Sequence, residues 1–345
     1  MKANISCLIG LLLCLLSGCG TLNYIDIETY NPAEVTFPEN VKKILVVNNS
    51  VPQSEDRGYK YTLLGKLQDT CKIQTDSIIF NTCRELGKAI VEENYFEDVL
   101  LYNDAIREDG LCYSDTKLTQ DKVQASCNES GADAIVSYDR LLFDITKETS
   151  FVSDGYYTSS FNAKATGVVR SYLPQREAPL ATIYVSDSLY WKEDAYTVSM
   201  LDDFLPPPSE ALNILSEYLA KKVRPYFVPY WEKETRWYYK GVGTRWQEAA
   251  AYAANEKWDE ASAIWKHIYE RSSSWKNKAK TACNIALTCE LKGDFKKAKE
   301  WADKSYALFK EHAGEKNNIR LLDLYVQVLS ARIQSDKKLN MQIGQ

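Results

Sequence analysis

The stretch GADAIVSYDRLLFDITKE, residues 131–148, decides the fold. It opens the first of three long segments in which apolar and polar residues alternate, and these segments continue to about residue 191. In the second segment one face carries apolar or small residues, namely Phe161, Ala163, Ala165, Gly167 and Val169. This alternation is typical of antiparallel strands with one buried and one hydrated face. The sequence therefore predicts a meander of long antiparallel strands.

Shorter elements precede the meander and set the fold class. Residues 44–47 form a short, mostly β-branched run, which predicts a central strand covered on both faces. A helical apolar spacing over 76–94, a second short strand at 97–102 and a helix over 119–130 follow, and a helix over 209–224 closes the domain. We therefore predict an α+β fold. Its N-terminal domain, residues 41–208, is an α/β sandwich in which helices cover one face of a mixed sheet.

This order of elements resembles the small α/β domains of bacterial envelope proteins. Examples are the amino-terminal domain of the Tol translocation protein and the periplasmic part of the curli secretion channel. The resemblance covers roughly residues 41–200 and rests on the order of the elements.

The charge changes sign along the chain. Residues 20–205 hold 17 Lys and Arg against 30 Asp and Glu, whereas residues 206–345 hold 24 against 17. This change supports a boundary near the three prolines at 206–208. Because the basic residues of the second half are interleaved with acidic ones, we expect a solvated helix surface and no nucleic-acid partner. The alternative is attraction between the halves or toward an acidic partner.

The second half contains two similar segments. NEKWDEASAIWKHIYE, residues 255–270, aligns with KGDFKKAKEWADKSYA, residues 292–307, at an offset of 37 residues. With helical stretches at 245–255 and 277–292, the second segment resembles a tetratricopeptide repeat, in which Gly293 lies in the turn between two helices. The first segment departs from the pattern, with Asn255-Glu256-Lys257 where that glycine is expected and Trp265 where a small residue is usual. We predict tetratricopeptide-like helices over 244–338 and a tail over 339–345.

The two halves are joined by an aromatic segment. Residues 209–243 comprise the closing helix and RPYFVPYWEKETRWYYKG, residues 224–241. A flexible linker would be rich in Gly and Ser, so we expect a packed joint, with a ligand-stacking surface as the alternative.

The amino terminus carries a targeting signal. An apolar run of about 12 residues follows Lys2, too short to cross a bilayer, and predicts a signal peptide over 1–18. The ending Leu-Ser-Gly-Cys resembles the bacterial lipobox, which implies acylation of Cys19 and a lipidated tether over 19–40. Because Gly20 stands where an inner-membrane retention signal would have Asp, we expect the outer membrane, on its periplasmic face rather than the cell surface.

No motif predicts a reaction, a cofactor or a metal site. Asp133, Asp139 and Asp144 are spaced along one predicted strand, and we expect them on its solvated face or at strand ends. The two histidines lie in the helical half. Six cysteines outside the signal and the lipidation site permit disulfides of unassigned connectivity, such as Cys71 with Cys83 or Cys112 with Cys127, and none has zinc spacing. Ser77 and Ser188 lie in sequences that resemble an O-glycosylation acceptor.

The joint carries a further resemblance, through Pro229, Trp231, Arg236, Tyr238 and Tyr239. With the lipobox, the α/β domain and the repeats, it resembles an uncharacterised family of bacterial envelope lipoproteins of unknown function. We expect an outer-membrane lipoprotein that is not an enzyme and that binds a protein partner through its helical repeats. The alternative is a glycan-binding or hydrolytic protein with its site in the N-terminal domain.

Overall fold

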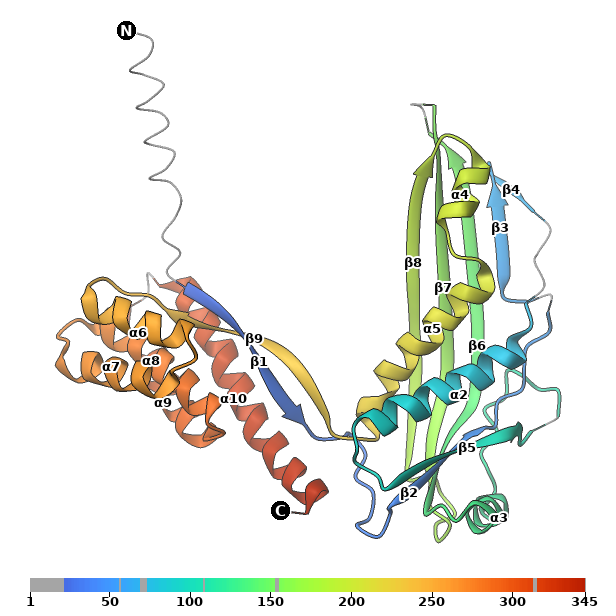
Figure 1. Cartoon of the computed structure of the whole chain (residues 1–345), viewed down its shortest axis with the longest axis horizontal. Coiled ribbons are helices and arrows are strands. Elements are labelled where there is room, and N and C mark those ends of the chain that lie inside the picture. The colour runs from blue at the N-terminus through green and yellow to red at the C-terminus, as the bar shows by residue number, and fades with distance from the viewer. Residues whose placement is uncertain are drawn as a thin grey trace. The chain divides into compact units, whose positions relative to one another are not determined.

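The chain divides into two compact units (Figure 1). The computed structural model describes residues 22–55, 57–68, 73–107, 109–152, 155–312 and 315–344. One unit, the sheet unit, comprises Pro32–Tyr230 with Gln342–Gln345. The other, the helical unit, comprises Met1–Asn31 with Trp231–Met341. The mixed α/β class expected from the sequence is confirmed.

The sheet unit is built around a seven-stranded mixed sheet. The predicted meander is present as β6 (Ala134–Phe151), β7 (Tyr157–Tyr172) and β8 (Ala181–Ala195), which pair antiparallel over nearly their whole length. The other edge of β6 pairs in parallel with β2 (Lys43–Asn48) and then with β3 (Tyr59–Leu63). The short strand β4 (Lys66–Leu67) pairs with β3, and β5 (Asp98–Ala105) pairs in parallel with β2.

Helices cover the two faces of the sheet unequally. The helices α2 (Thr75–Glu92) and α5 (Pro208–Val223) lie side by side on one face, where Leu86, Ile90 and Leu215 are buried in the main core (Figure 1). The helix α3 (Gln120–Ser130) packs with Leu45 and Ile135 in a separate core. These two positions have the opposite parity to the neighbouring core residues of their strands, so α3 lies on the other face. The sequence placed helices on one face only. The short helix α4 (Val198–Phe204) follows β8.

The helical unit contains two helical hairpins and a long final helix. The hairpins are α6 (Thr244–Ala254) with α7 (Trp258–Arg271), and α8 (Trp275–Leu291) with α9 (Phe295–Lys310). The final helix, α10 (Lys316–Ile343), continues five residues beyond the predicted end of the repeats. The helices predicted at 245–255 and 277–292 are therefore present, whereas their assignment as tetratricopeptide-like stays a prediction. Within the described residues, no helix is long and apolar enough to cross a membrane.

The segment expected to be a lipidated tether, residues 19–40, contains a strand. β1 (Leu22–Asn31) forms a two-stranded sheet with β9 (Tyr230–Tyr239), which lies in the aromatic joint and is preceded by a 3-10 turn at Arg224–Tyr226. Ile27 and Thr29 are buried, and the intervening Glu28 is exposed, so β1 has the alternation of a half-buried strand. The prolines at 32 and 38 follow this strand and do not interrupt it.

Candidate functional site

A groove of about 830 Å³ lies in the helical unit. One wall is β1, of which residues 23–30 all contribute to the lining, together with Trp231 and Tyr238 of β9. The opposite wall is formed by the turn between α6 and α7, the turn between α8 and α9, and the C-terminal half of α10. The aromatic residues in the lining come from both walls; they are Tyr24, Tyr30, Trp231, Tyr238, Trp258 and Phe295.

The lining of the groove is acidic. Asp26, Glu28, Glu256 and Asp336 all contribute to it, and among the described residues none of these four carboxylates takes part in an ion pair. The lining contains one cation, Arg332, whose guanidinium is held by hydrogen bonds to Tyr30 O and Asn31 Oδ1 and lies over the Phe295 ring. The whole segment 231–341 is basic, with 21 Lys and Arg against 15 Asp and Glu. The groove therefore presents negative charge in a unit whose segment 231–341 is net positive.

A buried ion pair lies beside the groove and includes the lining residue Glu290. The Arg236 guanidinium of β9 donates three hydrogen bonds of 2.9–3.1 Å to the Glu290 carboxylate of α8, and both residues are only 5% exposed. The Tyr325 hydroxyl of α10 donates to Glu290 Oε2 at 2.7 Å, and Arg236 also pairs with Glu234 Oε2 at 2.6 Å. This network ties β9 to α8 and α10, so the wall strand cannot move independently of the helices.

The pKa values of this network follow from its geometry. Burial alone would lower the pKa of Arg236, but the hydrogen bonds with Glu290 outweigh burial and raise it. Burial alone would raise the pKa of Glu234, and the hydrogen bond from Arg236 reverses this and lowers it. The guanidinium and the Glu234 carboxylate therefore both remain charged over the ordinary pH range.

The two turns in the groove have the same backbone conformation. Glu256 follows α6 with φ of 59°, and Gly293 follows α8 with φ of 75°. In each turn this residue donates its N–H to the carbonyl three residues earlier, Ala253 O at 3.1 Å and Glu290 O at 2.9 Å. The offset of 37 residues noted in the sequence thus holds at the level of the backbone, with glutamate in a conformation that favours glycine.

The three acidic residues singled out in the sheet unit do not form one site. Asp133 Oδ2 accepts the backbone N–H groups of Lys42 and Lys43 at 2.8 and 2.9 Å. Asp144 is exposed and lies with Lys164 at a smaller cavity of about 270 Å³. Asp139 is fully buried, which corrects the expectation that it lies on a solvated face.

Asp139 is buried because its carboxylate is completely hydrogen-bonded. Oδ2 accepts from Arg170 Nη1 at 2.6 Å and from the Tyr172 hydroxyl at 2.5 Å. Oδ1 accepts from Ser137 at 2.7 Å and Asn49 at 3.0 Å. These four donors replace the hydration that a carboxylate loses on burial. No lone pair is left for a substrate, so the arrangement is structural.

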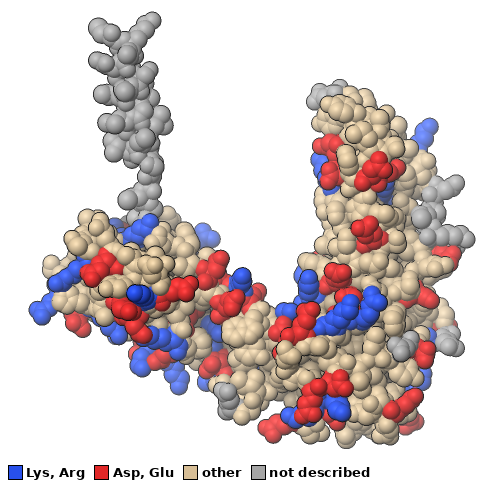
Figure 2. Space-filling model, viewed as in Figure 1, with Lys and Arg blue, Asp and Glu red and all other residues tan. Residues whose placement is uncertain are grey.

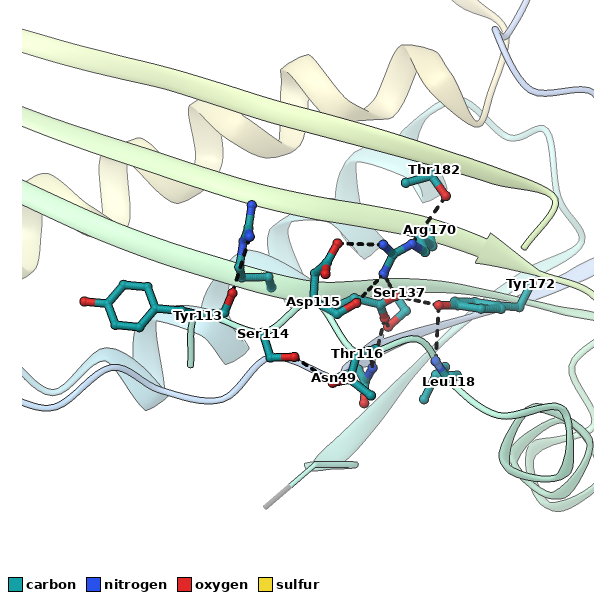
Figure 3. Close-up of polar contacts among 12 residues, drawn as sticks. Asn49, Tyr113, Ser114, Asp115, Thr116, Leu118, Ser137, Arg170, Tyr172 and Thr182 are labelled. Atoms are coloured by element: carbon teal, nitrogen blue, oxygen red, sulfur yellow. Dashed lines mark hydrogen bonds and ion pairs between the residues drawn. The ribbon is translucent and has the colours of Figure 1, made fainter. Parts of the chain in front are cut away.

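The same network holds the segment between β5 and α3 against the sheet. Figure 3 shows Arg170 reaching Asp115 and Thr182, while the Tyr172 hydroxyl accepts the Leu118 N–H at 3.2 Å. Arg170 pairs with Asp115 Oδ2 at 2.8 Å. The contacts with Asp115 and Leu118 fix this segment to β7.

The remaining predicted residues are distributed as follows. Cys19 and the signal peptide lie outside the described residues, as does Cys71. Cys112 and Cys127 are both free thiols, so the disulfide considered between them is not formed. Ser77 and Ser188 are exposed, and their modification stays a prediction. Among the described residues no cluster of His, Cys, Asp or Glu could hold a metal ion.

Comparison with known structures finds low similarity. A PelC dodecamer from Paraburkholderia phytofirmans is 9% identical, with a TM-score of 0.23, over 59% of this chain and 97% of that one. Lipoprotein GNA1162 from Neisseria meningitidis is 14% identical, with a TM-score of 0.18, over 52% and 96%. The hypothetical protein CT253 from Chlamydia trachomatis is 12% identical, with a TM-score of 0.22, over 54% and 97%.

Comparison of sequences assigns the chain to a family. No curated protein matches it. Two family models match: residues 41–239 match a domain of unknown function, DUF8603, and residues 247–331 match a second, DUF6340. The first match spans more than half of the chain, from just before β2 through β9. The chain therefore belongs to the DUF8603 family.

Proposed function

We propose that this protein is an outer-membrane lipoprotein whose helical unit binds an extended, cationic segment of a partner protein in the groove beside β1. The observation that carries the proposal is the set of four carboxylates in the lining, none of which has an ion-pair partner among the described residues. A partner that supplies Lys or Arg side chains would complement them.

The dimensions of the groove support a chain segment as the ligand. Eight consecutive residues of β1 line it, and at about 3.3 Å per residue a strand of this length extends about 26 Å. Aromatic side chains from both walls provide the large contact surfaces that interfaces favour. The carboxylates of the groove support a positively charged ligand, because the net basic segment 231–341 would repel a cation elsewhere on its surface.

Anchoring at the membrane is supported by the sequence. The lipobox resemblance at Cys19 and the residue Gly20 after it favour an acylated protein of the outer membrane, facing the periplasm. Several acyl chains hold a protein firmly on a bilayer, since each buried methylene contributes about 0.8 kcal/mol. We expect Cys19→Ala to abolish palmitate labelling and membrane retention. Unchanged labelling would contradict the anchor.

The alternative, a glycan-binding or hydrolytic site in the sheet unit, has less support. Such a site needs convergent carboxylates in a cavity. Asp133 binds backbone N–H groups through Oδ2, Asp139 is saturated with donors, and Asp144 is the one carboxylate among the described residues in the lining of its cavity, so these carboxylates do not converge. We therefore favour binding over catalysis.

A capture experiment tests the proposed groove. Full-length protein carrying Glu256→Gln and Asp336→Asn would be compared with the parent by affinity capture from cross-linked intact cells. A matched control replaces Glu260 and Glu300, exposed carboxylates outside the groove, by glutamine. We expect a specific partner to be lost from the groove variant and retained by the control. Equal capture by all three proteins would overturn the assignment of the groove.

A further inference from the structure

The first described residue of the chain lies very close to the predicted lipid anchor. Leu22 begins β1 and packs against the core of the helical unit. Only Gly20 and Thr21 separate it from Cys19. Three residue steps extend at most about 11 Å, so an acyl group on Cys19 would hold Leu22 within that distance of the bilayer surface.

The surface around Leu22 is apolar and cationic. A shallow groove of about 690 Å³ is lined by Leu22 and by the first turns of α10, including Lys316, Arg320, Leu321 and Leu324. Positions 316, 320 and 324 recur every four residues and share one side of the helix. Leu324 is 49% exposed and lies in the same groove lining as the two cations.

The cations of this surface are free to bind an anion. Among the described residues, neither Lys316 nor Arg320 forms an ion pair. The adjacent Glu315 is occupied by Lys276, and the flanking Asp323 accepts a hydrogen bond from Gln327. Figure 2 shows Lys and Arg distributed over the helical unit and interspersed with acidic residues. Cations alone therefore do not distinguish this surface, and its distinguishing feature is the combination of leucines with cations.

We propose that this surface, comprising Leu22 and the first turns of α10, lies directly on the phosphate-bearing surface of the bilayer that holds the anchor. The leucines would reach the boundary of the acyl chains, and Lys316 and Arg320 would contact lipid phosphates, as basic amphipathic surfaces do. The proposal rests on the acylation of Cys19 in the proposed function. A protein partner is disfavoured here because the two-residue connection leaves no room for a folded domain between Leu22 and the membrane.

The proposal also orients the groove. α8 begins beside α10, where Lys276 pairs with Glu315, and its far end at Leu291 lines the groove. A helix of 17 residues is about 25 Å long. With the first turns of α10 on the lipid, the groove would extend from Asn23, near the headgroups, to the end of α8, toward the periplasm.

Fluorescence quenching by brominated lipids tests the location of the surface. Acylated full-length protein, with Cys71, Cys112 and Cys289 replaced by serine, would carry one fluorophore at Asn317→Cys or, as a control, at Lys296→Cys in the first turn of α9. In vesicles of phosphatidylethanolamine and phosphatidylglycerol, we expect quenching at 317 and none at 296. Absence of quenching at 317, or equal quenching at both positions, would overturn the proposal.

A second measurement separates this proposal from the anchor. The Cys19→Ala protein, which lacks the acyl group, would be titrated with vesicles containing phosphatidylglycerol and with vesicles of phosphatidylcholine alone. We expect binding to the anionic vesicles only. The change K316Q with R320Q is expected to weaken it about 25-fold, at about fivefold per cation. Binding that is indifferent to these changes would overturn the lipid contact even if Cys19 is acylated, whereas failed palmitate labelling of the parent would overturn only the anchor.

Discussion

The two equivalent turns of the helical unit allow one test of the repeat geometry. Glu256 and Gly293 have nearly the same backbone conformation, with φ of 59° and 75°, and make equivalent hydrogen bonds. A Cβ added at Gly293 would meet no atom within 4 Å. Substitutions at these two positions therefore act through backbone conformation and not through packing, and we expect Glu256→Gly and Gly293→Ala to have opposite effects on stability.

The magnitude follows from two opposing contributions. A residue with a Cβ in the left-handed region costs about 1–2 kcal/mol relative to glycine. Glycine in turn costs about 0.4–1 kcal/mol because it increases the entropy of the unfolded chain. The difference predicts that Glu256→Gly raises the free energy of unfolding by about 0.5–1 kcal/mol. Gly293→Ala should lower it by a similar amount.

Tryptophan fluorescence during urea unfolding measures this difference, because seven of the eight tryptophans lie between residues 231 and 301. Destabilisation by Glu256→Gly, or no effect of Gly293→Ala, would refute the equivalence of the two turns. Because Glu256 also contributes a groove carboxylate, we expect Glu256→Gly to combine higher stability with weaker partner capture. Strain retained at a binding site commonly has this consequence.

Three further predictions concern buried and partly buried groups. Arg236→Leu leaves the Glu290 carboxylate buried without its cation, and should lower the free energy of unfolding by about 3–5 kcal/mol in the same urea assay. Burial alone would raise the pKa of Glu234, but the hydrogen bond from Arg236 lowers this pKa below the ordinary 4.5. The Glu234 carboxylate therefore stabilises the fold above pH 4.5, and its contribution is lost as the pH falls through the lower pKa of the folded state. Glu234→Gln should therefore lose less unfolding free energy than the parent between about pH 6 and about pH 3; an identical loss would contradict the ion pair. Burial raises the pKa of the Cys83 thiol to about 12, so a thiol reagent should label Cys112 in the native protein and Cys83 only after unfolding, as mass spectrometry would show.

Local periodicity explains what the sequence could predict. The alternation at Phe161, Ala163 and Ala165 corresponds to buried positions of β7. The apolar spacing over 76–94 corresponds to α2, Thr75–Glu92. The turn residue Gly293 lies between α8 and α9 as expected. Each of these signals arises from residues within one turn or one strand, where side-chain direction is fixed by the backbone.

Contacts between distant residues explain what the sequence could not predict. β1 pairs with β9, about 200 residues later in the chain, and no local sequence pattern predicts this pairing. The burial of Asp139 depends on Arg170, which the β6–β7 register places opposite Ser137. A polar residue in a strand looks solvated until its partner strand is known. The groove is likewise composed of β1, two turns and α10, and it exists only after these elements pack.

The strand β1 connects the two properties proposed for this protein. The alternation of Ile25, Ile27 and Thr29 was visible in the sequence, but the proximity of the lipobox and of two prolines favoured a tether. A flexible tether would leave the helical unit free to rotate above the membrane. A strand that starts three residues after the predicted anchor and is bound to β9 would instead fix the groove wall relative to the anchor. Acylation would then orient the binding site as well as retain the protein at the membrane, because the residues that follow the anchor are themselves part of the site.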